Sequence, residues 1–151
     1  MRSIALIVGI VLLMACQEGR SQPNDSEGQP AAAANQGKYY DVSVAPSELS
    51  VAEKGSVVVS LTPGSGYKWN DEYPAKFALK AGDGVTLEKA DFSFKKKEIE
   101  ITKKAASLAV PLAIAKAGKQ TIEFKGSFSV CNDTSCKIMR DEVFTVTVEG
   151  K

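Results

Sequence analysis

Apolar and polar residues alternate along most of the chain after residue 39. The alternation is clearest at 57–61, 98–101, 122–125 and 144–148, where every second residue is Val, Ile, Leu or Phe. A period of two is typical of antiparallel strands that bury one face. Because no stretch of this region keeps a helical period, the pattern predicts an all-β domain.

Turn-forming residues divide this region into about eight strands. The turns are expected at 63–66, 82–84 and 117–119. Each of these ranges lies between strand-like segments and contains Gly, and the first also contains Pro. The nine candidate segments are 39–45, 55–62, 66–70, 74–80, 84–92, 96–102, 106–115, 119–131 and 138–149; the third of them is short or irregular, which leaves about eight regular strands. Short strands at this spacing predict an immunoglobulin-like antiparallel β-sandwich, with a small closed barrel as the alternative.

The first 38 residues differ in composition from the predicted domain. Arg2 precedes an uncharged apolar run at 4–15, which has the layout of a signal peptide and is too short for a membrane span of about 20 residues. Residues 17–38 are rich in Gln, Gly, Ser, Pro and Asn, a composition that predicts a flexible tether, with at most a helical turn at 31–34. We therefore expect a signal peptide at 1–15, a linker at 16–38 and one domain at 39–151.

The end of the apolar run, Leu13-Met14-Ala15-Cys16, resembles the lipobox of bacterial lipoproteins. The resemblance implies cleavage before Cys16 and attachment of acyl chains such as palmitate to that cysteine, which together anchor a protein stably. Gln17 in place of Asp implies the outer membrane rather than the inner one. The expected location is the cell envelope, lipid-anchored and facing the periplasm; a plain secretory peptide with an incidental cysteine is the alternative.

Charge and composition exclude several classes of function. The chain has 19 basic and 18 acidic residues, and cleavage after residue 15 removes only Arg2, so the expected mature protein is neutral and nucleic acid is not an expected partner. Histidine is absent from the sequence, which removes the usual activation of Ser and Cys nucleophiles and the commonest transition-metal ligand. We therefore expect no cofactor, no metal site and no conventional hydrolase or nucleotide chemistry.

Two cysteines remain once Cys16 is assigned to the anchor. Cys131 and Cys136 are separated by four turn-forming residues and flanked by strand-like segments. In an oxidising compartment they are expected to form a disulfide at the base of a hairpin loop. Loop closure over so small a ring contributes only about 2 kcal/mol. The residues alone favour a structural bridge, with a redox-active one as the alternative.

The segment 126–136 and the strand that follows it resemble the periplasmic N-terminal domain of DsbD-type thiol:disulfide interchange proteins. Upstream, Gly66-Tyr67-Lys68-Trp69 is similar to the Gly-Tyr-aromatic segment of that family. The chain departs from the family pattern in having four residues between the cysteines instead of five. It also has Lys137-Ile138-Met139 where the family has an aromatic residue and two prolines.

The resemblance implies an immunoglobulin-like fold and a redox role for Cys131 and Cys136. The pair would exchange dithiol and disulfide with periplasmic thiol/disulfide proteins, beneath an aromatic cap that corresponds by chain order to Asp91, Phe92 and Phe94. The alternative is a non-catalytic binding or assembly module whose disulfide is purely structural.

Aromatic residues near position 70 allow two interpretations. Trp69 is the only tryptophan of the chain and is expected to pack in the core, with Tyr67 or Tyr73 at its rim. A ligand-facing role for Tyr67 and Trp69 is the alternative, and it predicts an exposed aromatic patch.

Overall fold

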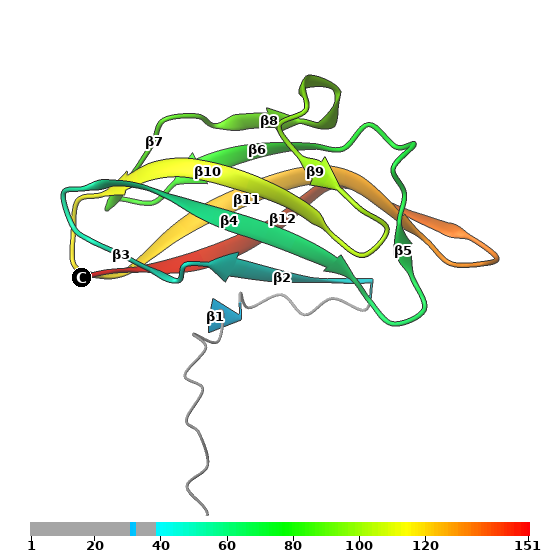
Figure 1. Cartoon of the computed structure of the whole chain (residues 1–151), viewed down its shortest axis with the longest axis horizontal. Helices are drawn as coiled ribbons and strands as arrows, with labels where there is room; N and C mark the ends of the chain where they lie inside the picture. The colour runs from blue at the N-terminus through cyan, green and yellow to red at the C-terminus, as the bar shows by residue number, and fades with distance from the viewer. Residues whose placement is uncertain (1–30, 33–38) are drawn as a thin grey trace, which may run out of the picture.

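A computed structural model shows the domain as two packed β-sheets, which overlap in the view of Figure 1 with the first sheet in front of the second. It describes residues 31–32 and 39–151. The expected signal peptide, Cys16 and most of the linker lie outside the described residues. Within the described part of the chain, no helix is long and apolar enough to cross a membrane.

The first sheet has the strand order β1-β2-β4-β10-β7, and β9 also pairs with β10. Every pair in it is antiparallel. Its strands are β1 (Ala31–Ala32), β2 (Tyr40–Ala45), β4 (Lys54–Pro63), β7 (Val85–Leu87), β9 (Glu100–Ile101) and β10 (Ala106–Ile114). The pairing of β1 with β2 differs from the helical turn considered for this part of the linker.

The second sheet has the order β3-β12-β11-β6-β8, and β5 also pairs with β11. Its strands are β3 (Glu48–Leu49), β5 (Lys68–Trp69), β6 (Lys76–Ala81), β8 (Asp91–Ser93), β11 (Gly118–Cys131) and β12 (Cys136–Gly150). Only β3, which follows a cis Ala45–Pro46 peptide, runs parallel to its neighbour β12.

The two strand orders confirm the predicted immunoglobulin-like sandwich. By chain order, β2, β4, β10 and β7 take the places of strands A, B, E and D of that fold, while β6, β11 and β12 take those of C, F and G. Because the described ladders form two separate sheets, the closed barrel is not the architecture.

Two predicted strands are divided differently in the structure. The segment predicted as one strand at 84–92 is split between the sheets, because β7 pairs with β10 and β8 pairs with β6. The segment predicted as a strand at 96–102 keeps only β9, because a 3₁₀ turn, η1 (Phe94–Lys96), precedes it and ends at Lys97 with a φ of 59°. A left-handed residue reverses the chain, so β8 cannot continue as an extended strand.

An aromatic cluster centred on Phe128 fills the space between the sheets. The Phe128 ring stacks on Trp69 at 5.2 Å between centroids and meets the edge of Tyr40 at 5.0 Å. Phe77 from the neighbouring strand lies 5.7 Å away. The hydroxyl of Tyr40 donates a hydrogen bond to Glu142 on the opposite sheet (3.0 Å). Four strands of both sheets therefore depend on the position of one ring.

We predict that Phe128→Ala lowers the free energy of unfolding by about 3–5 kcal/mol, because it leaves a cavity between Trp69, Tyr40 and Phe77. Urea denaturation of the native and variant chains measures the difference. Val143→Ala on the adjacent strand is the control: Val143 is 52% exposed, so its loss changes stability by about 0.5 kcal/mol or less. Equal effects of the two substitutions would show that the cluster is not the centre of the core.

Candidate functional site

The disulfide lies at the far end of the longest hairpin in the protein. Strands β11 and β12 pair from Gly118 opposite Gly150 to Cys131 opposite Cys136. Figure 1 shows this hairpin, in orange and red, extending beyond the rest of the sandwich. The sulfur atoms of Cys131 and Cys136 are bonded at 2.01 Å, which confirms the predicted disulfide.

The alternation of the antiparallel ladder explains why this cysteine spacing permits a bridge. The N–H of Asn132 donates to the carbonyl of Ser135 (2.9 Å), so these two residues form a hydrogen-bonded pair. The next pair outward from the turn is then a non-hydrogen-bonded one, whose Cα atoms approach most closely. Cys131 and Cys136 occupy it, with Cα atoms 3.9 Å apart. Two turn residues and one bonded pair account for the four intervening residues.

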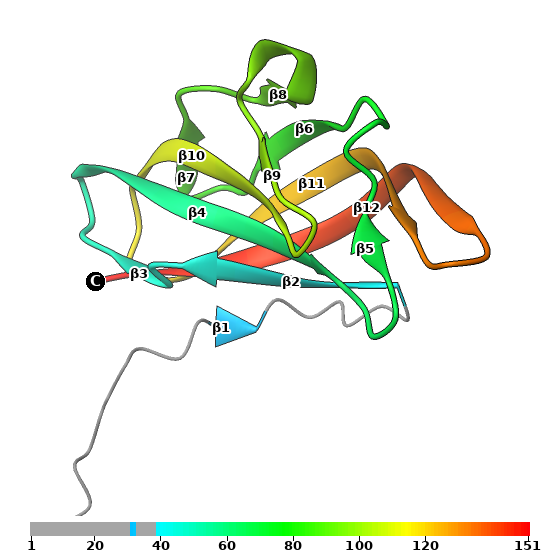
Figure 2. The ribbon, with the colours of Figure 1, turned by 45° about the vertical axis from the view of Figure 1, so that its right-hand side comes forward.

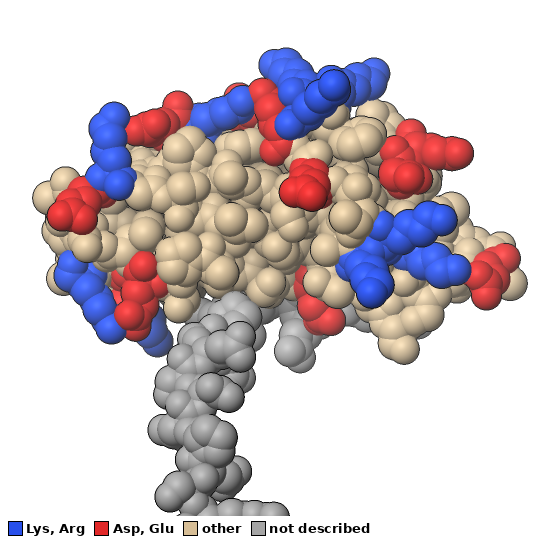
Figure 3. All heavy atoms as spheres, in the orientation of Figure 1, with Lys and Arg blue, Asp and Glu red and all other residues tan. Residues whose placement is uncertain are grey.

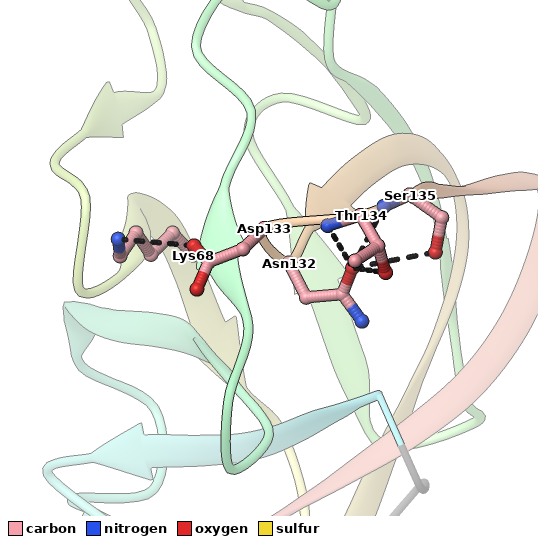
Figure 4. A network of polar contacts seen from close by, with 5 residues as sticks. All are labelled: Lys68, Asn132, Asp133, Thr134 and Ser135. Carbon is pink, nitrogen blue, oxygen red and sulfur yellow. Dashed lines mark hydrogen bonds and ion pairs between the residues drawn. The ribbon is translucent and has the colours of Figure 1, made fainter.

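The side chain of Asn132 organises the loop that the disulfide closes (Figure 4). Its carboxamide oxygen accepts hydrogen bonds from the backbone N–H groups of Thr134 (3.0 Å) and Ser135 (2.8 Å). It also lies 3.1 Å and 3.3 Å from their hydroxyl groups. The tip is thus held by local polar contacts and extends away from the aromatic core.

A cation and an apolar side chain flank the disulfide on the outer face of the second sheet. Lys68 on β5 is the register partner of Cys131, so their side chains lie side by side on one face. The Lys68 ammonium is 3.9 Å from Asp133, and both side chains are largely exposed. On the other strand, Ile138 lies two residues beyond Cys136 and is 48% exposed. Cys136 itself is exposed, and Cys131 is partly buried.

The expected cap does not lie over the disulfide in this structure. Strand β8, which carries Asp91 and Phe92, pairs with residues 76–78 of β6, and these pair with 125–127 of β11. Cys131 is a further four residues along β11, or about 13 Å. Figures 1 and 2 show β8 and the hairpin tip apart in both views.

The reason for this correction is the pairing of the segment itself. Phe92 is 4% exposed because it lies opposite Phe77 and packs into the core. The N–H of Phe94 donates to the carbonyl of Ala75 (2.9 Å), which holds the start of η1 against the β6 side of the sheet. Hydrogen bonding to β6 therefore fixes the predicted cap residues two strands away from β11.

The aromatic residues near position 70 are largely interior. Trp69 is 3% exposed, so it is a core residue, as its favoured interpretation predicted, and its indole nitrogen has no partner among the described residues. Tyr67 is partly buried and meets the edge of Tyr39 at 5.4 Å between centroids. Tyr73 is partly buried and lines a groove that the hydrophobic pattern does not predict.

That groove crosses the outer face of the second sheet. It consists of two adjoining cavities of about 420 and 490 Å³, which share Lys76, Ser93, Ser127 and Asp141 as lining residues. Its depth arises beside Ala78, which presents only a methyl group between the longer side chains of neighbouring strands. The alternation of apolar residues carried no signal for it, because the groove depends on how β8 and η1 fold back over β6.

A double irregularity in the hairpin shapes one wall of the groove. The β11–β12 register shifts between Gly126 and Phe128, and Asp141 opposite has a φ of 54°. Gly126 has no side chain here because a Cβ atom would lie 2.5 Å from the Phe77 ring. The N–H of Asp141 donates to the Ser127 hydroxyl (3.3 Å), and the Asp141 carboxylate lies 3.3 Å from Lys125.

Glu98 closes the free edge of β8 at the opposite wall. Its carboxylate accepts the N–H of Ser93 (3.0 Å) and forms a close ion pair with Lys89, while its own N–H donates to the Ser93 carbonyl (3.3 Å). The hydrogen bond from Lys89 is the main cause that lowers the pKa of Glu98; burial opposes it and the Ser93 N–H adds to it. Both outward backbone groups of Ser93 are thereby occupied, so β8 is protected from pairing with another strand.

Comparison with known proteins identifies no family for this chain. No protein-family model matches the chain, and no curated protein matches it. The GAE domain of GGA2p from Saccharomyces cerevisiae is 14% identical, with a TM-score of 0.40 over 77% of this chain and 95% of that one. The CARDB domain of the PF1109 protein from Pyrococcus furiosus is 16% identical, with a TM-score of 0.38 over 77% and 97%. The collagen-binding domain of a Staphylococcus aureus adhesin is 10% identical, with a TM-score of 0.37 over 76% and 99%.

We predict that the edge of β8 loosens in acid because of Glu98. Its pKa is lower in the folded chain than in the unfolded one. The stability that ionised Glu98 gives to the folded chain is therefore complete above the ordinary carboxyl pKa of about 4.3. It is lost as the pH falls through the lower pKa of the folded chain. Hydrogen exchange at the Ser93 amide, corrected for intrinsic rates, should lose protection in that window. Glu98→Gln should show the reduced protection already at neutral pH, and identical profiles for the two chains would contradict the assignment.

Proposed function

We propose that the protein is a cell-envelope lipoprotein that exchanges dithiol and disulfide with periplasmic partners through Cys131 and Cys136. Cys16, which lies outside the described residues, would carry the lipid anchor and hold the domain on the periplasmic side. The main support is the position of the disulfide at the exposed tip of a projecting hairpin. Its resemblance to DsbD-type N-terminal domains supports the same chemistry.

The exposure of the two cysteines suggests the order of the exchange. A partner thiolate attacks Sγ of the more exposed Cys136, which forms a mixed disulfide with the partner and breaks the bond to Cys131. Cys131 leaves as a thiolate and takes up a proton. The second thiolate of the same partner then attacks the partner sulfur of the mixed disulfide and releases Cys136 as a thiolate. The partner dithiol becomes a disulfide, and two electrons pass to the pair on this chain.

Lys68 is placed to assist the step in which Cys131 leaves. Its side chain lies beside that of Cys131 on the same face, and a neighbouring ammonium stabilises a thiolate. Asp133, 3.9 Å from the Lys68 ammonium, opposes this effect by neutralising part of its charge. Ile138 provides an exposed apolar contact for a partner next to Cys136.

A structural disulfide in a non-catalytic binding module is the second candidate. The observation that favours it is the set of hydrogen bonds to Asn132, which holds the loop independently of any exchange chemistry. Among the described residues, no aromatic side chain of β8 covers the disulfide. This is compatible with either candidate function, because an uncovered disulfide can serve as a structural bridge or meet a partner thiol. The reduction potential separates the two candidates.

We predict a reduction potential between about −180 and −270 mV for the Cys131–Cys136 pair, the range of proteins that exchange disulfides. The full chain is equilibrated with glutathione and dithiothreitol buffers, and mass spectrometry follows the peptide that contains both cysteines, so Cys16 does not contribute. A potential below about −300 mV would sink the exchange function and leave the structural bridge.

We further predict that Lys68→Met slows reduction of the disulfide by about threefold, because the leaving Cys131 thiolate loses a nearby positive charge. Asp133→Asn should accelerate reduction by a similar factor, since it frees the same ammonium. Stopped-flow reduction by a small dithiol at low ionic strength measures both rates. A matched control is Lys119→Met, an exposed lysine at the opposite end of β11 from Cys131. Equal rates for all chains would exclude a role for Lys68.

A further inference from the structure

The groove on the second sheet is lined by more basic residues than acidic ones. Five basic and three acidic residues line its two cavities. Asp141 is paired with Lys125, and Glu98 with Lys89, which lies outside the groove. Among the described residues, one acidic and four basic lining residues then form no ion pair: Asp91, Lys76, Lys95, Lys96 and Arg140.

This excess is local, because the chain as a whole has a net charge of +1. Figure 3, in the orientation of Figure 1, shows lysine and arginine side chains projecting at the top of the molecule, near β8 and η1, with acidic side chains beside them. Glu98 attracts Lys96, but Lys76, Lys95 and Arg140 line one cavity without an ion-pair partner. These three cations repel one another, and an anion between them would remove that repulsion.

Ser127 supplies a second feature of an anion site, independent of the lysines. Its side chain is 8% exposed and lines both cavities at the point where they join. Its oxygen accepts the N–H of Asp141 (3.3 Å), and among the described residues its hydroxyl proton has no acceptor. A nearly buried hydroxyl of this kind keeps its proton available to donate to a ligand oxygen in the adjoining cavity.

The charge and shape together specify the kind of anion. Arg140 presents a planar fork of donors that matches two oxygens of one ligand group, and Lys76 and Lys95 add compact charges beside it. Several uncompensated cations match a doubly charged group better than a single carboxylate. The adjoining cavity, beside Ala78, is lined more by apolar surface and has room for the remainder of a small molecule.

We propose that this groove binds a small phosphate monoester. Its phosphate lies among Lys76, Lys95, Arg140 and the Ser127 hydroxyl, and its organic part lies over Ala78. The site is separate from the disulfide, so binding does not depend on the oxidation state of Cys131 and Cys136.

Binding of phenyl phosphate to the full chain in detergent micelles tests the proposal. Chemical shifts of the Ser127 and Ala78 amides are followed during the titration, with the disulfide intact. Lys95→Gln combined with Arg140→Gln should weaken binding by about tenfold or more, because two charged hydrogen-bond donors are lost. Both side chains are exposed, so the variant is expected to fold. Lys104→Gln, outside the groove, should bind like the native chain.

Two further ligands and one further variant locate the parts of the site. Dimethyl phosphate, a singly charged diester like a phospholipid headgroup, should bind more weakly than phenyl phosphate, as should inorganic phosphate. Ala78→Trp, which fills the adjoining cavity, should remove the advantage of phenyl phosphate over inorganic phosphate. Undiminished binding in the Lys95/Arg140 variant would overturn the anion site. Tighter binding of the diester would overturn the monoester and point to a lipid headgroup.

Discussion

The antiparallel ladder between β11 and β12 is the constraint on which the rest of the molecule depends. It runs from Gly118 and Gly150 at one end to the disulfide at the other. The edge of β11 that faces away from β12 pairs with both β5 and β6. Its inward residues include Phe124, Phe128 and Phe144, which dominate the core. A one-residue slip would turn these rings toward solvent and would also separate the cysteines, so a single register fixes the core and the candidate site together.

The irregularity within this ladder divides it into two structurally distinct regions. On one side of it, regular pairing leads to the hairpin tip, where Cys131 and Cys136 face outward beside Lys68. At the irregularity, Gly126 admits the Phe77 ring, and Ser127 and Asp141 are brought into contact at the wall of the groove. Bulges commonly redirect side chains near functional sites, and here the bulge shapes one wall of the groove.

The two surfaces differ in what they offer a partner. The hairpin tip presents a disulfide beside one cation and one apolar side chain, and its loop is ordered by Asn132 rather than by packing. The groove presents unpaired cations around a nearly buried hydroxyl. Both lie on the outer face of the second sheet. The covering of Ser93 by Glu98 prevents β8 from extending that sheet into another chain.

The sequence by itself determined the fold class, most strand positions and the disulfide, because each depends on local pattern. The period of two fixes which residues of β4, β11 and β12 face the core, and four turn-forming residues between two strands fix the pairing of Cys131 with Cys136. The tertiary structure alone decided what surrounds the disulfide. The chain order placed Asp91, Phe92 and Phe94 as a cap, but pairing of β8 with β6 turns Phe92 into the core, and β5 brings Lys68 to Cys131 instead. Which strand lies beside which is set by long-range hydrogen bonding between segments distant in sequence, and no local pattern in the sequence encodes it.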